Sequence, residues 1–408
     1  MQITRQQRLE LYQQATKQLR DDIFSESFSV DTFDAEQYLT ELQSSFPELS
    51  LRPEWLKHNA QEFMTEAEKL RRTRSDEAWR KIFPRYPIEK DGFARSFLPE
   101  QESEILECIE EFGLVVVKVF NDEECERSIQ AIFEEVNAYP SNCRREKVQL
   151  EKPWTWRSVN WPSRSKFLVS DPAFHQQAFD NRCHDAVYHV FSTLWKEKHL
   201  MVNIDRWGIG RGTQDLDFLC EDGSIEKRAR PDWGLRMTMH WDYNPWLFVS
   251  ELESGLDPGY QSLLAFVDQD LSTGCHLTLP GGARFLPQWC RENRAPSRLG
   301  SKRRSHRPTD DDPILGYMQP IPIRKGELLV WSWGQLHSCT PNSSHRMRLH
   351  QYIGMFPAQD INPFYAIHEN WSCLKVLRRY KEEFDLQSIR LNSRGEKLLG
   401  QRSWLETP

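Results

Sequence analysis

The sequence predicts a mainly β protein with flanking helices, built on a double-layer jelly-roll core and preceded by a helical region. Short apolar or β-branched runs recur from residue 97 onward, and Gly or Pro bounds several of them, as is typical of jelly-roll strands. Residues 1–96 carry helical periodicity instead. The chain has 408 residues, and all-β barrels and sandwiches often exceed roughly 200 residues as one unit. One large β core with an N-terminal helical extension is therefore expected.

The predicted helical extension, residues 1–96, is polar and rich in Gln, Glu, Lys and Arg. Apolar side chains recur in it at the spacing of one helix face, at Leu9, Tyr12, Leu19 and Ile23. A second helical stretch is expected around residues 55–83, before Pro84, Pro87 and Gly92 interrupt the pattern. These helices are expected to form a layer packed against the core, and a partner-binding arm is the alternative.

The predicted core includes a helix whose start is marked in the sequence. Asn121 is a good N-cap, and Glu124 three residues later completes a capping box. Strands are expected where apolar runs are short and β-branched, at residues 115–117, 263–267 and 328–330. These runs supply strands of the predicted double layer.

Composition and charge exclude several classes of protein. The formal net charge of −7 is mild and argues against a nucleic-acid partner. No apolar run approaches the roughly 18 residues that span a bilayer, and the polar first residues lack the apolar segment of a signal peptide. Nine Cys occur without a C-x-x-C pair, which is the usage of reduced intracellular thiols. A cytoplasmic protein with no membrane partner is expected.

The most informative motif is the pair His240 and Asp242, taken together with His337 far downstream. On a strand, residues i and i+2 point to the same face, so the imidazole of His240 and the carboxylate of Asp242 can converge on one ion. His337 follows the apolar run 328–331, as a third ligand carried by another strand would. Two His and one carboxylate form the facial triad that leaves positions open on non-haem Fe(II). The sequence therefore predicts an iron site at these residues.

Several motifs surround the triad in a fixed order along the chain. They include Ile109-Glu-Glu-Phe-Gly-Leu-Val-Val-Val-Lys118, Met239-His-Trp-Asp-Tyr-Asn-Pro-Trp246, Thr273-Gly-Cys-His-Leu-Thr-Leu-Pro-Gly-Gly282, Lys325-Gly-Glu-Leu-Leu-Val-Trp331 and His337-Ser-Cys-Thr-Pro-Asn342. In this order the motifs resemble those of the phytanoyl-CoA dioxygenase family of Fe(II)/2-oxoglutarate-dependent oxygenases. The similarity covers about residues 97–404 and includes the tail segment 391–400.

This resemblance implies a double-stranded β-helix core of the cupin-like kind at residues 97–408. It further implies that Fe(II) is the catalytic metal, that 2-oxoglutarate is the cosubstrate, and that ascorbate could serve as a reductant. The ligands of the iron would be His240, Asp242 and His337.

For the cosubstrate, the resemblance implies that Arg348 holds the far carboxylate, because its planar guanidinium can bind both oxygens. Arg346, two residues earlier, is the competitor for this role. Asn342 matches a family position near the cosubstrate. Cys339 stands where the family commonly has a Ser, and Thr340 or Ser338 is the expected substitute.

The reaction that the resemblance implies is hydroxylation or desaturation of an unactivated C–H bond in a small organic substrate, with succinate and CO2 as coproducts. Halogenating relatives carry Ala or Gly where Asp242 stands, so halogenation is not expected. The alternative is a non-catalytic jelly-roll binding or scaffold protein that retains the cofactor pocket. Formation of succinate from 2-oxoglutarate would separate the two hypotheses.

A basic insertion at about residues 287–317 is the most unusual local feature. One hypothesis is a solvated loop, since such polar segments bury little apolar area. The other is a lid whose guanidinium groups meet an anionic substrate. The substrate itself and the oligomeric state are left open. The basic residues of the insertion are Arg291, Arg294, Arg298, Lys302, Arg303, Arg304 and Arg307.

Several other His and Trp residues are expected to have structural roles or to line a pocket. Three histidines are expected to be surface or structural residues, namely His276, His345 and His350. Five tryptophans could either line a substrate pocket or fill the core, namely Trp154, Trp156, Trp161, Trp241 and Trp246.

Overall fold

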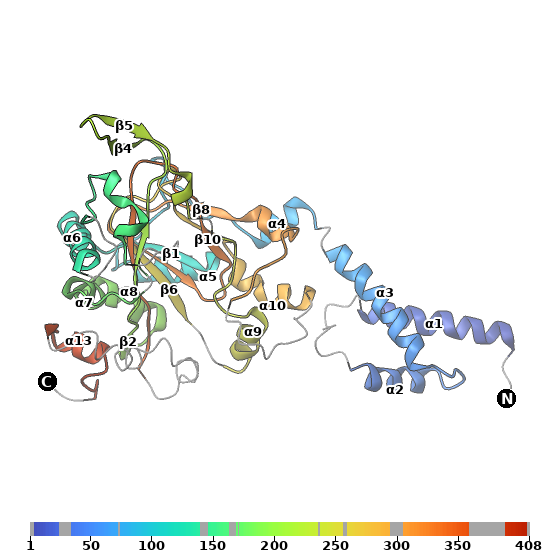
Figure 1. The fold of residues 1–408 in the computed structure, drawn as a ribbon. Coiled ribbons are helices and arrows are strands. Elements are labelled where there is room, and N and C mark those ends of the chain that lie inside the picture. The colour runs from blue at the N-terminus through green and yellow to red at the C-terminus, as the bar shows by residue number, and fades with distance from the viewer. Residues whose placement is uncertain are drawn as a thin grey trace.

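The computed structural model describes residues 4–23, 34–71, 74–138, 146–162, 169, 171–235, 237–255, 259–293, 305–358 and 388–405. Antiparallel sheets form the centre of the main body, and helices lie at its sides (Figure 1). The prediction of a β core with flanking helices is confirmed.

Two sheets carry the core, and all of their strand pairs are antiparallel. The larger sheet has five strands, in the order β1 (Leu114–Lys118), β9 (Glu327–Ser332), β6 (Tyr260–Ala265), β11 (Arg348–Tyr352) and β3 (Trp207–Gly210). The smaller sheet has three, in the order β10 (His337–Cys339), β7 (His276–Thr278) and β8 (Gln319–Ile321). From β6 to β11 the chain passes repeatedly between the two sheets. Residues far apart in the sequence therefore become neighbours.

The apolar runs predicted as strands contribute to the buried centre of the larger sheet. β9 lies between β1 and β6, and its residues Leu328, Leu329 and Val330 are fully buried. A strand that is buried on both faces carries a continuous apolar run, which made these strands visible in the sequence. Apolar side chains of flanking helices join the same cluster, among them α5 (Glu102–Phe112), α6 (Asp122–Ala138), α7 (Gln176–Arg182) and α8 (Asp185–Trp195).

Helix α6 begins as the sequence predicts. Oδ1 of Asn121 accepts a hydrogen bond from the backbone N–H of Glu124 (3.0 Å), and Oε2 of Glu124 accepts one from the backbone N–H of Asn121 (2.8 Å). The two bonds satisfy two donors at the helix end, where no carbonyl of the helix itself can reach. The capping box is confirmed, and the helix that it starts buries Ile132 and Val136.

The N-terminal helices divide into two groups by packing. Three of them bury apolar side chains against one another, namely α1 (Arg5–Ile23), α2 (Ala35–Ser45) and α3 (Pro53–Arg71). The fourth, α4 (Asp76–Ile82), adds Trp79 to a cluster of the main body. Ser75 caps α4 by accepting from the backbone N–H of Ala78 (3.2 Å), which separates it from α3. Of the four N-terminal helices, α4 therefore packs on the core as the sequence predicted, whereas α1, α2 and α3 pack against one another.

Shorter elements complete the described chain. Two small sheets pair β2 (Leu200–Val202) with β12 (Met355–Pro357) and β4 (Leu216–Leu219) with β5 (Ile225–Arg228). The remaining helices are α9 (Pro245–Glu253), α10 (Gly282–Glu292) and α13 (Ser393–Leu398). The 3-10 helices are η1 (Pro153–Trp156), η2 (Ser158–Asn160), η3 (Pro231–Trp233) and η4 (Pro313–Tyr317). Among the described helices, none combines the length and the apolar character needed to cross a membrane.

Replacing the cap of α6 tests how much this helix start contributes to stability. We expect Asn121→Ala to lower the free energy of unfolding by about 1 kcal/mol, because the N–H of Glu124 loses its acceptor. Asn121→Asp keeps a side-chain oxygen at that position, so it should lose much less. Urea unfolding followed by circular dichroism measures both, and equal stabilities of the two variants would contradict this account of the cap.

Candidate metal centre

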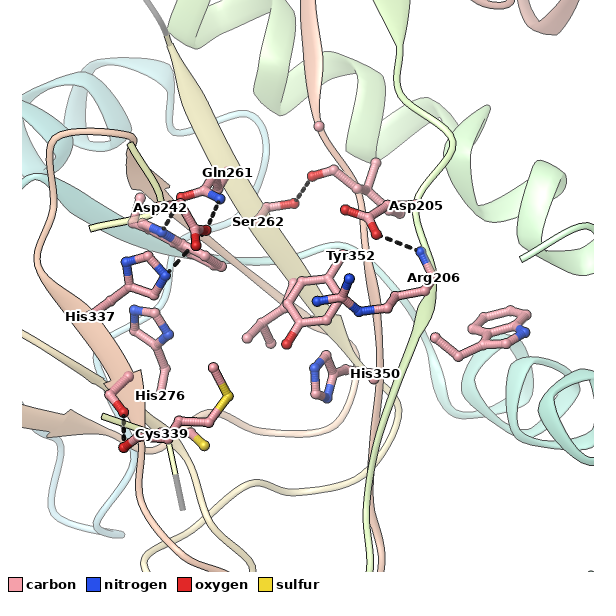
Figure 2. Close-up of a pocket in the computed structure, with 18 of the residues that line it drawn as sticks. Asp205, Arg206, Asp242, Gln261, Ser262, His276, His337, Cys339, His350 and Tyr352 are labelled. Carbon is pink, nitrogen blue, oxygen red and sulfur yellow. Dashed lines mark hydrogen bonds and ion pairs between the residues drawn. The ribbon is translucent and has the colours of Figure 1, made fainter. Parts of the chain in front are cut away.

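The three predicted ligands converge in the structure. Nε2 of His240 lies 3.3 Å from Oδ1 of Asp242, and Nε2 of His337 lies 3.5 Å from Oδ2 of the same carboxylate. One ligand atom from each residue falls within 4.8 Å of the others. Asp242 and His337 stand close together at one side of the view (Figure 2).

Backbone pairing holds the two imidazoles in place. The N–H of His240 donates to the carbonyl of His337, and the N–H of His337 donates to the carbonyl of His240, each at 3.0 Å. This bridge joins residue 240 to the edge of the smaller sheet at β10. The ring centroids are consequently only 4.7 Å apart, although 96 residues separate them in the sequence.

Each imidazole is oriented by a hydrogen bond from its Nδ1 atom, the ring nitrogen that points away from Asp242. Nδ1 of His240 lies 2.8 Å from the carbonyl of Thr238, and Nδ1 of His337 lies 3.0 Å from the carbonyl of Gln335. A carbonyl oxygen only accepts, so both Nδ1 atoms carry the proton and both Nε2 atoms face the carboxylate. Metal-bound histidines are commonly oriented in this way.

The resulting site requires a positive charge. Two Nε2 lone pairs and the carboxylate of Asp242 repel one another unless a proton or a metal ion lies between them. Burial raises the pKa of Asp242, but the hydrogen bonds and positive charge that His240 and His337 supply when their Nε2 atoms are protonated outweigh burial and hold it well below its usual range. Burial lowers the pKa of His240, yet its bond to Asp242 more than offsets this and raises it.

Gln261 on β6 fixes the carboxylate. Its Nε2 donates to Oδ2 of Asp242 (2.7 Å), and its Oε1 accepts from Nε1 of Trp331 (3.0 Å). The amide therefore has a defined direction and links Asp242 to the larger sheet. Nothing in the sequence identified Gln261, because its role depends on which strands lie side by side.

A central cavity of about 200 Å³ opens beside the triad, and residues of both sheets line it. Its polar lining includes Asp205, Arg206, Arg348, His350 and Tyr352, and Figure 2 shows four of these across from His337. Its apolar lining includes Leu235, Met237, Trp333 and Phe356.

Arg348 faces this cavity and Arg346 does not. Arg348 is the first residue of β11, is only 7% exposed, and donates from Nε to Oε1 of Gln269 (2.7 Å). Arg346 precedes the strand, is exposed, and pairs with Asp270 at 2.9 Å. Of the two arginines that the sequence left in competition, the structure brings only Arg348 to the cavity.

Thr340 and Asn342 do not line the cavity. Oγ1 of Thr340 accepts from the backbone N–H of Cys275 (2.8 Å). The side chain of Asn342 donates to the carbonyl of Arg346 (2.8 Å) and accepts from Ser344. Both side chains thus shape the turn that leads to β11, and a direct contact with a cosubstrate has no support among these bonds.

Ser338 and Cys339, the neighbours weighed with Thr340, do line the cavity. Oγ of Ser338 donates to the carbonyl of Met237 (2.8 Å), so this hydroxyl is already engaged with the backbone.

Two of the three histidines set aside in the sequence line the cavity. His276 and His350 are 3% and 4% exposed, whereas His345 is exposed as expected. Burial lowers the pKa of both buried imidazoles well below the usual range, and the charge of Arg348 lowers it further. The position of His350 two residues after Arg348 was the signal that could have identified it.

The tryptophans that could have lined a pocket mostly fill the core. Trp241 and Trp246 lie in the cluster that contains α9 and α10, and Trp156 and Trp161 lie in the main cluster, while Trp154 packs against it. Instead, the cavity is lined by Trp207, Trp331 and Trp333.

Five of the seven basic residues of the insertion lie outside the described residues, namely Arg294, Arg298, Lys302, Arg303 and Arg304. The described Arg291 and Arg307 are exposed and do not line the cavity. Within the insertion, the backbone of His306 pairs with that of Trp241, which places this part of the segment beside the metal motif.

Comparison with known proteins agrees with the resemblance seen in the motifs. No family model matches the sequence. A curated protein of Dictyostelium discoideum, named "Putative phytanoyl-CoA dioxygenase", is 23% identical over 327 residues, which cover 72% of this chain and 86% of that protein.

Solved structures give looser matches. GlcNAc Inducible Gene 2 of Candida albicans is 12% identical, covers 82% of each chain and has a TM-score of 0.48. A hypothetical protein of Escherichia coli is 13% identical over 98% of this chain and 97% of its own, with a TM-score of 0.47. The epimerase SnoN, in complex with Fe3+, alpha ketoglutarate and nogalamycin RO, is 14% identical over 64% of this chain and 85% of its own, with a TM-score of 0.39. The predicted similarity to the phytanoyl-CoA dioxygenase family is supported at the level of sequence by the Dictyostelium relative.

Proposed function

We propose that this protein is a non-haem Fe(II)/2-oxoglutarate-dependent dioxygenase with His240, Asp242 and His337 as metal ligands. The observation that carries the proposal is the convergence of the three ligand atoms within 4.8 Å. Two nitrogen donors and one carboxylate suit iron, and a triad on one side leaves positions open for other ligands. Because both Nδ1 atoms donate to backbone carbonyls, both Nε2 atoms are already oriented to bind a metal ion.

The cosubstrate fits the residues around Arg348. This guanidinium is buried beside the cavity and, within the described residues, forms no ion pair. A buried cation without a carboxylate partner is unfavourable, and the far carboxylate of 2-oxoglutarate would supply that partner. Gln269 fixes the plane of the guanidinium through its bond to Nε. Thr340 and Asn342 would act indirectly, by shaping the turn before Arg348.

The core is proposed to be a double-stranded β-helix that spans residues 97–408 with α1 to α4 before it. The strand order in the two sheets, together with the bridge between His240 and His337, supports this assignment. In such a fold the smaller sheet presents two metal ligands and the larger sheet presents Arg348, so a cosubstrate can lie between the sheets.

The proposed reaction is hydroxylation or desaturation of an unactivated C–H bond in a small organic substrate. The bound metal would let O2 oxidise both 2-oxoglutarate and the substrate: one oxygen atom enters succinate as CO2 leaves, and the other enters the hydroxylated product or leaves as water when the substrate is desaturated. The chain's own residues hold and orient these groups, and the apolar lining of the cavity limits access of water. The carboxylate of Asp242 occupies a position that a halogenating enzyme would leave open, which favours oxygen insertion or desaturation.

Removing a single ligand tests the metal assignment. We expect His240→Ala, Asp242→Ala and His337→Ala each to weaken Mn(II) binding by more than about 100-fold, since even partners of ligands contribute about 10- to 100-fold. Succinate formation from 2-oxoglutarate, measured with Fe(II) and ascorbate, should also be lost. His345→Ala removes an exposed histidine and should change neither quantity.

Retention of more than half of wild-type succinate formation by two of the three variants would show that the triad is wrongly assigned. A wild-type protein that binds metal and 2-oxoglutarate but forms no succinate with any candidate substrate would favour the scaffold alternative.

Exchange of the two arginines tests the cosubstrate assignment. Arg348→Lys keeps the charge but loses the bidentate fork, so we expect the Kd for 2-oxoglutarate to rise by about 10-fold or more. Arg346→Ala should leave this Kd unchanged, because Arg346 pairs with Asp270 at the surface. Anaerobic calorimetry on the Mn(II)-loaded protein measures both. The reverse pattern would transfer the role to Arg346 and leave the metal site intact.

A further inference from the structure

Two buried imidazoles that line the central cavity carry unpartnered nitrogens. In the described part of the chain, Nε2 of His276 and both ring nitrogens of His350 are buried without a hydrogen-bond partner. Both residues line the cavity. Buried polar atoms in proteins are almost always hydrogen-bonded, and an exception indicates either a cost tolerated for function or a missing ligand. Three unpartnered nitrogens around one cavity indicate a polar ligand there.

The two imidazoles belong to opposite walls of the cavity. His276 lies on β7 of the smaller sheet, and its ring stacks on that of His337 at 5.7 Å between centroids. His350 lies on β11 of the larger sheet, two residues after Arg348 and on the same face. Figure 2 shows His276 next to His337, and His350 next to Tyr352, with the cavity between them. A molecule in the cavity can therefore meet one of these rings on each wall.

The ring of His350 is held in this position by the absence of a side chain on β3. Gly208 is paired with His350 across the two strands. A Cβ on Gly208 would lie 1.9 Å from Nε2 of His350, so any larger residue would displace the ring. The edge of the imidazole also meets the ring of Tyr352 at 4.8 Å between centroids. Gly208 on one side and Tyr352 on the other bound the space that the ring of His350 occupies.

The chemistry of a neutral imidazole suits a carboxylate or keto oxygen. Each neutral ring carries one N–H donor, whereas a carboxylate only accepts. Both nitrogens of His350 are unpartnered, so no hydrogen bond within the described residues fixes which of them carries the proton. Burial and the nearby guanidinium groups of Arg348 and Arg206 lower the pKa of His350, so the ring stays neutral beside these cations. A dianion would then receive hydrogen bonds without adding a further charge to the wall.

We propose that His276 and His350 complete the binding site for the 2-oxo dicarboxylate, each donating an N–H hydrogen bond to one of its oxygens from opposite sheets. This inference rests on the proposed function, because it takes the triad as the chelating end and Arg348 as the far end. It adds two residues that position the cosubstrate and select a dianion of its length.

The test is anaerobic calorimetric titration of 2-oxoglutarate into the full-length, Mn(II)-loaded protein. His276→Phe and His350→Phe keep a ring of similar size but remove every nitrogen, whereas His276→Gln and His350→Gln keep an N–H donor. We expect both Phe variants to bind Mn(II) like the wild type and to bind 2-oxoglutarate about 10-fold or more weakly. The Gln variants should recover part of that loss, and His345→Phe, at an exposed site, should bind like the wild type.

Three results would overturn the inference. The first is an unchanged Kd for 2-oxoglutarate in both Phe variants, and the second is equal weakening by Phe and Gln at the same position, which would indicate packing alone. The third applies if a Phe variant fails to fold or to bind Mn(II). Gly208→Ala then moves the His350 ring without removing an imidazole, and an unchanged Kd in this variant would exclude a role for His350. A wild-type protein that binds Mn(II) but not 2-oxoglutarate would instead overturn the proposed function and this inference with it.

Discussion

The candidate site depends on one pairing of backbone groups, the two hydrogen bonds between His240 and His337. They set two imidazoles and the carboxylate of Asp242 against one another at distances that are unfavourable without a cation. The buried side chain of Gln335 anchors this region. Its Nε2 donates to the backbone carbonyls of Phe112 (3.1 Å) and Leu279 (2.6 Å), and the backbone carbonyl of Gln335 orients the ring of His337. The site is therefore as rigid as the sheets that carry it, which is what an oriented metal site requires.

Unsatisfied polar atoms gather around this site. Among the described residues, six side chains contain a buried nitrogen or oxygen without a partner, and Gln269, His276 and His350 are three of them. Gln269 holds Arg348, and the two histidines line the cavity. By contrast, the buried carboxylate of Glu135 is fully engaged, with the N–H of Phe174 (2.8 Å) and Nε1 of Trp207 (2.6 Å). Proteins tend to depart from full hydrogen bonding where function demands it.

The sequence could predict the features that depend only on the spacing and type of neighbouring residues. The central strands, the capping box at Asn121 and the i, i+2 pair of His240 and Asp242 follow from local spacing and apolar character. Gln261 and His276 could not be predicted, since their roles depend on which strands are neighbours and in what register. The resemblance implied Arg348 in preference to Arg346, but the physical difference between them appears only in the structure, where β11 begins at Arg348 after the turn shaped by Asn342. Residue type alone does not reveal that boundary.

The arrangement of charge in the cavity gives the proposed cosubstrate a single orientation. The metal ligands come from the smaller sheet and its extension, whereas Arg348 and Arg206 lie at the opposite wall with the neutral ring of His350 beside them. A 2-oxo dicarboxylate has one end that can chelate and one end that cannot. In the proposed site only the end with adjacent keto and carboxylate oxygens suits the triad, so the simple carboxylate would reach Arg348. The separation of the proposed chelating site from the cationic site would then select both the length of the dianion and its direction.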